Sequence, residues 1–461
     1  MRESSKNSMD KIARKIILRL QKKYPQTYLV GGAVRDMLLG KKNFDLDIAT
    51  EALPAEVKRE LESMGLRFFD AAEKFGTIGV PSGDGKNIEI TTFRKESEYE
   101  DLRHPAKITF IASARADAKR RDFTVNSLYY DPRAHKVLDF TGGRHDLKHQ
   151  KIRFVGSPET RIKEDPLRLL RAVRFASNLN FEIADKDLKS IKKHSGLASI
   201  VAPERTKAEL DKIFSGENFL RGFELLDETG ILKILLPEVE ALKKVRQSRD
   251  FHSEGNAFIH TALILKEMKD EKLLMRYAGL LHDIGKKDTE KINFRKGSRH
   301  ISFYGHAPAG AEKFETISRR LNFSRREKQQ IKYLISSHMD LLNITQIREK
   351  TLVKMAKKPY FSDLLRLRIY DNIASIADKE HAKKDNSETI ALKKILKKSL
   401  PWKKRMQRKL LSGREVMRIL KIDEGKRVGK ILEQISIQAA LGKIKTKKEA
   451  EKFVKTLDNR F

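Results

Sequence analysis

A run of small and charged residues near the N-terminus, followed closely by two spaced aspartates, constrains the fold of this chain most strongly. The run is Leu29-Val30-Gly31-Gly32-Ala33-Val34-Arg35-Asp36, and Asp45 and Asp47 come just after it. If residues 44–49 form a β-strand, both carboxylates point to one face and can hold the same divalent cation. A glycine pair ahead of a helix also exposes backbone N–H groups that bind a phosphate. Asp-x-Asp alone is typical of turns, but at this spacing the pattern predicts a nucleotidyl-transfer site.

Three further segments follow in order along the chain. They are Arg120-Arg121-Asp122-Phe123-Thr124-Val125-Asn126-Ser127, Asp139-Phe140-Thr141-Gly142-Gly143 and Glu164-Asp165-Pro166-Leu167-Arg168-Leu169-Leu170-Arg171-Ala172-Val173-Arg174-Phe175. Together with the first run, they resemble the class II tRNA nucleotidyltransferase (CCA-adding enzyme) and bacterial poly(A) polymerase family, within the polymerase β-like superfamily. The resemblance is dense over residues 25–215 and returns in the C-terminal half.

Length and charge indicate a large protein with a polyanionic partner. A chain of 461 residues is too long for one compact core, so two to four domains are expected. Lys and Arg outnumber Asp and Glu by 97 to 63, a net charge of +34 that favours RNA or DNA because phosphate neutralisation releases counterions. The chain has no cysteine, which suits a reducing compartment. We expect a cytoplasmic protein with no membrane contact, whose first 22 residues form a basic amphipathic helix.

The pattern of apolar residues predicts an α+β protein that becomes helical after about residue 158. Residues 27–30, 44–49, 77–80 and 88–92 resemble strands, with a hairpin turn at Gly83-Asp84-Gly85. The resemblance implies a polymerase β-like head with a small mixed sheet, followed by an all-α neck, an HD-type body and a tail. We assign residues 1–150 to the catalytic head, 151–220 to the neck, 221–390 to the body and 391–461 to an RNA-binding tail.

A basic run within this tail is open to two interpretations. Residues 393–409 carry nine basic residues and no acidic one, interrupted by Pro401 and Trp402. Such a run is either a solvated linker or a contact to the tRNA backbone.

The resemblance implies the roles of the head residues. Asp45 and Asp47 would bind two Mg²⁺ ions, and Glu89 would complete the catalytic carboxylates, although an edge-strand glutamate is more often simply solvated. Phosphoryl transfer depends largely on such positioning and charge stabilisation. The triphosphate would lie against Gly31, Gly32 and Arg35, with an Arg35–Asp36 ion pair as the alternative role of that arginine. Arg121 and Asp122 match a motif whose aspartate reads the ribose 2′-hydroxyl.

Four polar residues of the neck recur at three-residue intervals. Residues so spaced stay on one side of a helix over two turns, so the sequence predicts one wall that carries a carboxylate and three guanidinium groups. The resemblance assigns Asp165 and Arg168 to the Watson–Crick edge of the incoming base, and Arg171 and Arg174 to the nucleotide more broadly. This is chemically sensible because aspartate accepts from the exocyclic amine that C and A share, while arginine donates to ring acceptors.

A histidine set in the body resembles the HD metal-dependent phosphohydrolase signature. It comprises His260, the pair His282 and Asp283, and a closing aspartate that we place at Asp371, with Asp378 as a rival. His306 and His338 could complete a second metal position. Imidazole and carboxylate ligands suit a transition metal such as Ni²⁺ or Mn²⁺.

The leading interpretation is template-independent addition of CCA to tRNA 3′ ends from CTP and ATP. Polyadenylation is the nearest alternative, since Leu128-Tyr129-Tyr130-Asp131-Pro132 resembles the poly(A) branch. An A-adding enzyme also remains open, whereas the segment from Glu98 to Pro105 resembles a flexible loop that CC-only enzymes lack. A phosphohydrolase with a head that merely binds RNA is a further alternative. The sequence leaves the oligomeric state open.

Overall fold

The computed structural model describes most of the chain, which divides into two compact units. The described residues are 11–41, 46–72, 75–82, 87–99, 105–246, 255–295, 298–375 and 382–457. The first unit comprises residues 1–235 and the second residues 236–461. Four features of the sequence analysis lie outside the described residues. They are Asp45, the turn at 83–85, most of the loop that begins at Glu98, and Asp378.

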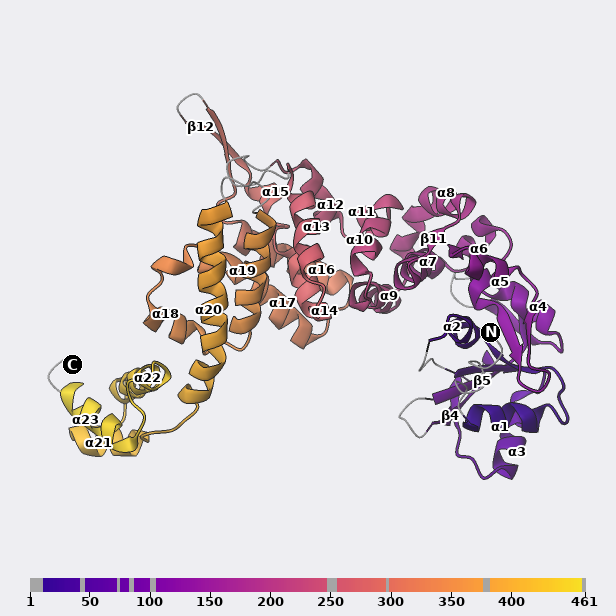
Figure 1. The fold of residues 1–461 in the computed structure, drawn as a ribbon, viewed down its shortest axis with the longest axis horizontal. Coiled ribbons are helices and arrows are strands. Elements are labelled where there is room, and N and C mark those ends of the chain that lie inside the picture. The colour runs from indigo at the N-terminus through magenta and orange to yellow at the C-terminus, as the bar shows by residue number, and fades with distance from the viewer. Residues whose placement is uncertain are drawn as a thin grey trace. The chain divides into compact units, whose positions relative to one another are not determined.

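A mixed seven-stranded sheet forms the centre of the head (Figure 1). Its central strands β2 and β5 run parallel, whereas every other neighbouring pair in this sheet is antiparallel. A separate antiparallel ribbon pairs β6 (Arg94–Tyr99) with β7 (Pro105–Phe110). The order across the seven-stranded sheet is β3 (Phe69–Ala72), β4 (Thr77–Pro81), β5 (Asn87–Thr92), β2 (Leu46–Thr50), β1 (Thr27–Val30), β8 (Leu128–Asp131) and β9 (Lys136–Asp139).

Short helices surround this sheet, and the neck follows them in the same unit. The head helices are α1 (Lys11–Leu20), α2 (Gly32–Leu38), α3 (Pro54–Ser63), α4 (Ala114–Arg120) and α5 (Gly143–Lys148), with the 3₁₀ turn η3 (Thr124–Asn126). The neck has a short parallel pair, β10 (Lys151–Ile152) and β11 (Glu182–Ile183). Its helices are α6 (Pro158–Glu164), α7 (Leu167–Leu179), α8 (Asp185–His194), α9 (Pro203–Ser215), α10 (Phe219–Glu228) and α11 (Ile231–Leu235), with η4 (Ser195–Ile200) between α8 and α9.

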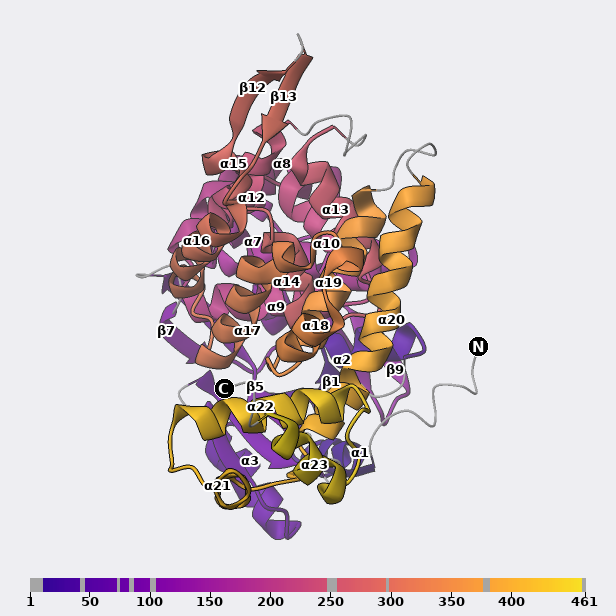
Figure 2. The same ribbon diagram turned by 90° about the vertical axis from the view of Figure 1, so that its left-hand side faces the viewer.

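Where the structure describes the second unit, its regular elements are helices and one hairpin. The strands β12 (Lys291–Arg295) and β13 (Ser298–Ser302) form this antiparallel hairpin, which extends away from the helices in Figures 1 and 2. The long helices α19 and α20 lie side by side. The helices are α12 (Pro237–Glu240), α13 (Ala257–Glu267), α14 (Leu273–Leu281), α15 (Lys286–Thr289), α16 (His306–Arg320), α17 (Arg325–Ser337), α18 (Glu349–Met355), α19 (Phe361–Ser375), α20 (Ala382–Met406), α21 (Gly413–Leu420), α22 (Lys426–Ala440) and α23 (Lys447–Leu457), with 3₁₀ turns η5 (Ala241–Lys244), η6 (His338–Leu341) and η7 (Ile344–Gln346).

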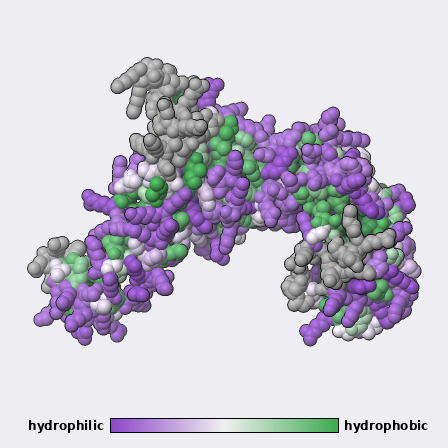
Figure 3. Space-filling model, in the orientation of Figure 1, coloured by the Kyte–Doolittle hydropathy of each residue, from purple (hydrophilic) through white to green (hydrophobic). Residues whose placement is uncertain are grey.

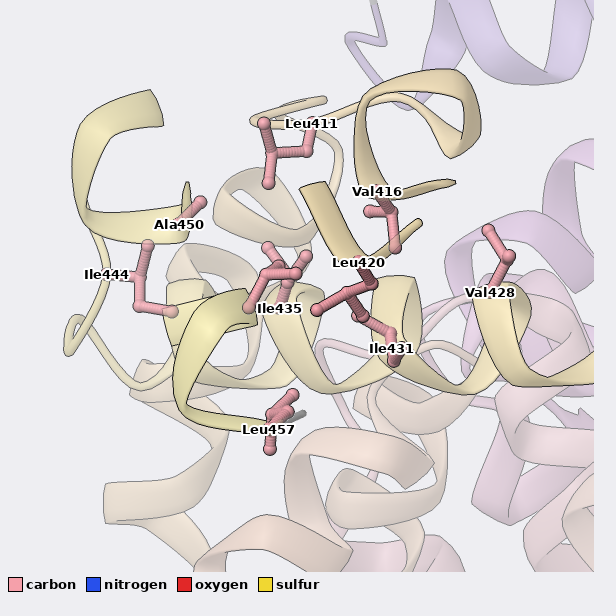
Figure 4. Packing of buried hydrophobic residues seen from close by; sticks show 10 residues of the cluster. Leu411, Val416, Leu420, Val428, Ile431, Ile435, Ile444, Ala450 and Leu457 are labelled. Atoms are coloured by element: carbon pink, nitrogen blue, oxygen red, sulfur yellow. The ribbon is translucent and has the colours of Figure 1, made fainter. Parts of the chain in front are cut away.

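The last three helices of the chain share a hydrophobic core of their own. Leu420, Ile431 and Ile435 point toward one another in Figure 4, and Val454 and Leu457 from α23 belong to the same cluster. A capping box at Ser412 and Glu415 fixes the start of α21. The terminal segment is therefore a small packed three-helix element.

The face of the molecule drawn in Figure 3 is mostly hydrophilic. Among the described helices, none is both long enough and apolar enough to cross a membrane.

Most of the expected elements are confirmed. The strands at 27–30, 77–80 and 88–92 are β1, β4 and β5, and the amphipathic N-terminal helix is α1. The expected α+β class is also confirmed. The four-part domain division remains a prediction.

Three local expectations were wrong. The single helix expected to carry Asp165 and the three arginines is interrupted: α6 ends at Glu164 and α7 begins at Leu167. The reason is Pro166, which has no backbone N–H and disfavours helical geometry at Asp165. Glu89 lies on β5, an interior strand between β4 and β2, and not on an edge. The basic run at 393–409 is largely helical rather than a linker, since α20 continues through Pro401 to Met406 and buries Trp402.

Candidate functional site

The first candidate site lies where β1 meets α2, beside β2 and β5. Gly31 has φ +69° at the start of α2, a conformation that strongly favours glycine. A Cβ atom at Gly31 would lie 3.7 Å from Asp47 Oδ2 and 3.2 Å from Arg121 Nη1. The missing side chain therefore leaves room for the α2 N-terminus to lie against Asp47 and Arg121.

Two predicted catalytic carboxylates are neighbours on adjacent strands. Asp47 on β2 is paired in register with Glu89 on β5. Residues in register on neighbouring strands project to the same face of a sheet, so both carboxylates belong to one face, on which Glu89 is exposed.

Arg35 points to two partners within the head. Its guanidinium donates to both oxygens of Asp36, from Nε at 2.9 Å and from Nη2 at 2.8 Å. Nη1 donates to Asn126 Oδ1, and the guanidinium carbon lies 5.3 Å from the centroid of the Phe175 ring. The Arg35–Asp36 ion pair that we weighed against phosphate binding is therefore present.

Arg121 is held by a buried polar network. Its Nε donates to the Tyr129 hydroxyl at 3.0 Å, and Nη2 donates to Asp117 Oδ2 at 3.2 Å. The Tyr129 hydroxyl in turn donates to the same Asp117 oxygen at 2.6 Å. Burial disfavours the charged forms of both Arg121 and Asp117. Tyr129, Asp117 and Asp47 outweigh this effect at Arg121 and raise its pKa. Arg120 and Arg121 outweigh it at Asp117 and lower its pKa to about 2. Arg121 is therefore a fixed cation near Asp47.

Asp122 joins the head to the first long neck helix. One carboxylate oxygen accepts from the Phe123 backbone N–H at 2.7 Å, and the other accepts from Arg171 Nε at 2.8 Å. Burial would raise the pKa of Asp122, but the Arg171 guanidinium outweighs it and lowers this pKa to about 2. Asp122 is therefore ionised and oriented by α7.

The remaining arginines of α7 divide between two sets of partners. Arg168 donates to Glu164 at 2.7 Å and to the backbone carbonyl groups of Arg161 and Arg120. Arg174 lies 3.1 Å from Glu209 on α9, with its guanidinium carbon 4.1 Å from the centroid of the Phe175 ring. Burial lowers the pKa of Arg174 to about 10.

Asp165 lies before α7 and not on it. Its Oδ1 accepts from the Leu167 backbone N–H at 3.1 Å, and its Oδ2 accepts from Arg205 at 2.9 Å. The predicted single helical wall is thus corrected to a junction residue followed by three helical arginines.

A second candidate site lies among the helices of the second unit. His260 Nε2 on α13 lies 3.0 Å from Asp371 Oδ1 on α19, and Arg368 donates to the other Asp371 oxygen. His282 Nε2, just after α14, lies 3.1 Å from Asp283 Oδ2. The structure therefore brings together all four residues of the predicted HD site.

His306 and His338 extend this cluster. Their Nε2 atoms lie 3.0 Å apart, and they lie 3.4 Å and 3.8 Å from Asp283 Oδ1. His260, His282 and Asp283 form one group with converging ligand atoms, and Asp283, His306 and His338 form another. Asp283 is therefore positioned to bridge two metal positions.

Backbone carbonyl groups set the tautomers of three of these histidines. The Nδ1 atoms of His282, His306 and His338 lie 2.9, 2.8 and 2.7 Å from the carbonyl oxygens of Gly279, Phe303 and Ile335. An Nδ1–H that donates to a carbonyl leaves the Nε2 lone pair for a metal. Burial lowers the pKa values of His306 and His338, the latter to about 3, so both rings are neutral.

The donor set fits a divalent transition metal. His282 Nε2 and Asp283 Oδ2 are buried and 3.1 Å apart, and Lys286 Nζ lies 2.6 Å from the same Asp283 oxygen, but none of these contacts has the angles of a hydrogen bond. Two neutral Nε2 atoms that face each other at 3.0 Å repel unless a cation lies between their lone pairs. Burial would raise the pKa of Asp283, but His282 and Lys286 hold it well below its usual value.

Gly285 explains how the His282–Asp283 turn reaches α16. A Cβ atom at Gly285 would lie 2.1 Å from the His306 carbonyl oxygen and 2.5 Å from the Gly310 backbone nitrogen. The two segments can thus approach only because position 285 has no side chain.

Comparisons with known proteins match the regions of the chain that contain the two candidate sites. The family described as "Poly A polymerase head domain" matches residues 27–153, "Probable RNA and SrmB- binding site of polymerase A" matches residues 180–243, and "HD domain" matches residues 251–383. A CCA-adding enzyme of Bacillus pumilus is 39% identical over 228 residues, which cover 50% of this chain and 54% of the relative. One of Levilactobacillus brevis is 42% identical over 220 residues, covering 48% and 54%. The chain thus spans about half the length of these curated relatives.

Solved structures share the fold along nearly the whole chain. The crystal structure of the Bacillus stearothermophilus CCA-adding enzyme in complex with CTP has a TM-score of 0.68 at 24% identity and covers 98% of both chains. The Thermotoga maritima CCA-adding enzyme complexed with tRNA has a TM-score of 0.62 at 20% identity and covers 98% of this chain and 97% of that one. At these identities the likeness shows the fold.

The family models match, in chain order, a polymerase head, an RNA-binding segment of that polymerase and an HD domain. The chain is similar to CCA-adding enzymes over about half of its length, and the residues matched by the HD model include the histidine and aspartate groups of the second candidate site. A nucleotidyltransferase head of the matched kind implies the use of divalent metal ions.

Several supporting residues were missed in the sequence. Arg205 and Glu209 are four residues apart on α9, and they contact Asp165, Arg171 and Arg174. The four-residue spacing was a usable signal, because such residues share a helix face. Asp117, Asn126 and Tyr129 gave no comparable signal, since their partners become neighbours only after folding.

The Asp122→Asn substitution should lower the free energy of unfolding by about 2 kcal/mol at pH 7, because it removes an ionised partner of Arg171. The folded pKa of Asp122 is depressed, so its stabilising effect is present above the unfolded value near 4 and is lost as the pH falls through about 2. Urea unfolding measures the difference.

The exposed pair of Asp70 and Lys58 supplies the control. Asp70→Asn removes a surface ion pair of 2.8 Å and should cost less than about 1 kcal/mol. Equal losses for the two variants would contradict the buried, ionised state of Asp122.

Proposed function

We propose that this protein adds CCA to the 3′ ends of tRNA from CTP and ATP without a nucleic-acid template, in the cytoplasm. The observation that carries the proposal is the placement of Asp47 and Arg121 beside Gly31 at the end of β1, with Asp122 next to Arg121 in the chain and held by Arg171. This placement supplies a phosphate cradle, a carboxylate and a fixed cation at one place, as nucleotidyl transfer requires. The CCA-adding enzymes that match about half of the chain support the same activity.

The head carboxylates would hold Mg²⁺ in this proposal. Asp47 and Glu89 share one face of the sheet, and Asp45, outside the described residues, is two positions before Asp47. Oxygen ligands from carboxylates are those that Mg²⁺ prefers. Bound there, Mg²⁺ would supply charge stabilisation for the triphosphate. Gly31, Gly32 and Arg35 would contact the triphosphate, for which Arg35 must exchange part of its pairing with Asp36.

The neck would select the base. Asp165 and Arg168 are our candidates for the Watson–Crick edge, while Arg171 and Arg174 border the nucleotide. Arg205 contacts Asp165, and Glu209 contacts Arg174. These contacts support the role, because a side chain that reads a base must be held in one orientation. Asp122 would accept from the ribose 2′-hydroxyl while Arg171 keeps it ionised.

Polyadenylation and A-only addition remain the alternatives. The segment Leu128-Tyr129-Tyr130-Asp131-Pro132 resembles the poly(A) branch, and the Tyr129 hydroxyl within it is bound to Asp117 and Arg121.

Asp47→Ala should lower the rate of nucleotide addition by roughly 100-fold or more, because it removes a charge that would hold the metal near the triphosphate. The measurement is incorporation of radiolabelled CTP and ATP into tRNA that lacks CCA. Asp70→Ala removes an exposed carboxylate elsewhere in the head and should leave the rate unchanged. If Asp47→Ala kept a tenth of the parental rate while folded by circular dichroism, the metal assignment would fail.

We also propose that the HD cluster hydrolyses phosphoesters with Ni²⁺ or Mn²⁺. The facing Nε2 atoms of His306 and His338 carry this second proposal, since their tautomers leave two lone pairs directed at one point. His260, His282, Asp283 and Asp371 would hold the other metal position. Arg368 and Lys286, which pair with the two carboxylates, are then the cations that a metal would partly replace.

The double substitution His282→Ala and Asp283→Ala should abolish release of phosphate from 2′-phosphate substrates and opening of 2′,3′-cyclic ones. CCA addition should remain near normal, because the polymerase residues belong to the first unit. Glu312→Ala, an exposed carboxylate on α16, is the matched control. Loss of both activities in the folded double variant would contradict two separate sites.

A further inference from the structure

The hairpin formed by β12 and β13 has little packing against the rest of the described structure. The two strands pair with each other over five positions, from Lys291 with Ser302 to Arg295 with Ser298. Neither strand packs extensively on a described helix, and both views show the hairpin extending from the helices (Figures 1 and 2). Because an isolated two-stranded hairpin is marginally stable in water, this element is suited to gaining contacts from a partner.

The charge of this segment favours a polyanion. Residues 286–300 contain six Lys or Arg residues and two acidic residues. Lys287 and Lys291 are exposed in the described structure, and Lys287 lies 3.5 Å from Glu290. Exposed ammonium groups of this kind bind phosphates through counterion release.

Tyr304 adds an exposed aromatic ring at the base of the hairpin. Its exposed fraction is 93%, the highest among the large apolar side chains of the described residues, and Ile292 nearby in the hairpin is 47% exposed. An unpaired aromatic ring beside basic residues is typical of surfaces on which single-stranded bases stack.

A hydrogen bond holds the backbone next to Tyr304 against the HD cluster. The carbonyl of Phe303 accepts from His306 Nδ1 at 2.8 Å, and its ring packs on the core of Leu242, Val245 and Ala257. Lys286 Nζ lies 5.6 Å from the Phe303 ring centroid and 2.6 Å from Asp283 Oδ2. Tyr304 is therefore an exposed residue next to Phe303, which is anchored in the core, and two positions before His306.

We propose that the β12–β13 hairpin and Tyr304 bind single-stranded RNA, with one base stacked on Tyr304 and the terminal phosphoester directed to the HD cluster. This inference rests on the proposed phosphoesterase function and names its substrate class as the phosphorylated end of an RNA chain. The basic segment would contact the backbone of the nucleotides that precede the stacked base. A free mononucleotide would leave this segment without a partner.

The test compares three substrates in the presence of Mn²⁺. They are a ten-nucleotide RNA with a 2′,3′-cyclic phosphate end, 2′,3′-cyclic AMP, and glycerol 1,2-cyclic phosphate, which has no base. Tyr304→Ala should raise KM for the RNA roughly tenfold, as expected for the loss of one stacked base. Tyr304→Phe, which keeps the ring, should stay within about twofold of the parent. Both variants should hydrolyse the base-free substrate at the parental rate.

Lys291→Gln separates the polynucleotide from the mononucleotide. This substitution should raise KM for the RNA substrate more at low salt than at high salt, and it should leave KM for 2′,3′-cyclic AMP unchanged. An unchanged KM for RNA in Tyr304→Ala would overturn the proposal. An equal loss of activity with the base-free substrate would also overturn it, because Tyr304 would then have a structural role. An equal effect of Lys291→Gln on cyclic AMP would assign a mononucleotide site instead.

Photocrosslinking keeps the proposal testable if the phosphoesterase function fails. Should the parent hydrolyse none of the three substrates, the full-length protein is irradiated with an RNA that carries 4-thiouridine near its 3′ end. A crosslink to the peptide that contains Tyr304 would support the RNA surface without catalysis. Crosslinks confined to residues of the first unit would overturn it.

Discussion

The ion pair between the Asp122 carboxylate and the Arg171 guanidinium joins the head to the neck at the proposed polymerase site. It lies beside an aromatic contact, in which the buried Phe123 ring packs edge-on against Phe175 of α7 at 5.5 Å. The Asp122 side chain is 10% exposed and that of Arg171 is 31% exposed, and a carboxylate with so little access to water needs a charged partner. Glu209 on α9 extends the pairing, since it lies 3.9 Å from Arg171 and 3.1 Å from Arg174. The position of the α7 arginines is thus set by the head on one side and by α9 on the other.

The sequence predicted the parts of this site that depend on local chemistry. The strand that carries Asp47 and the glycine pair before α2 could be read from neighbouring residues. The placement of Glu89 on an interior strand, in register with Asp47, could not, because it depends on how the strands pair. The error at Asp165 came from extending a three-residue spacing across Pro166, although proline before a helix is a standard start signal. The spacing of Glu209 from Arg205 could have shown that both lie on one face of α9, but the contact of Glu209 with Arg174 joins residues 35 positions apart, which single-sequence patterns do not report.

In the HD cluster, too, the sequence predicted the residues but not the contacts that orient them. The identities of its four predicted residues, and of the second pair His306 and His338, were visible in the sequence. Their tautomers were not, because these depend on the carbonyl groups of Gly279, Phe303 and Ile335, which carry no side-chain signal. Gly285 and Gly310 likewise have a role that appears only in three dimensions, where they let α16 approach the His282–Asp283 turn.

The order of nucleotides that the protein adds tests the central claim most directly. Three tRNA substrates that end before the first C, after C and after CC are incubated with Mg²⁺ and one or both of CTP and ATP, and the products are sequenced. Our account predicts two C residues and one A on the shortest substrate, a single A on the longest, and no further extension. Long A tracts on all three substrates would contradict it. So would addition of A to the substrate that ends after CC with no addition of C to the two shorter substrates.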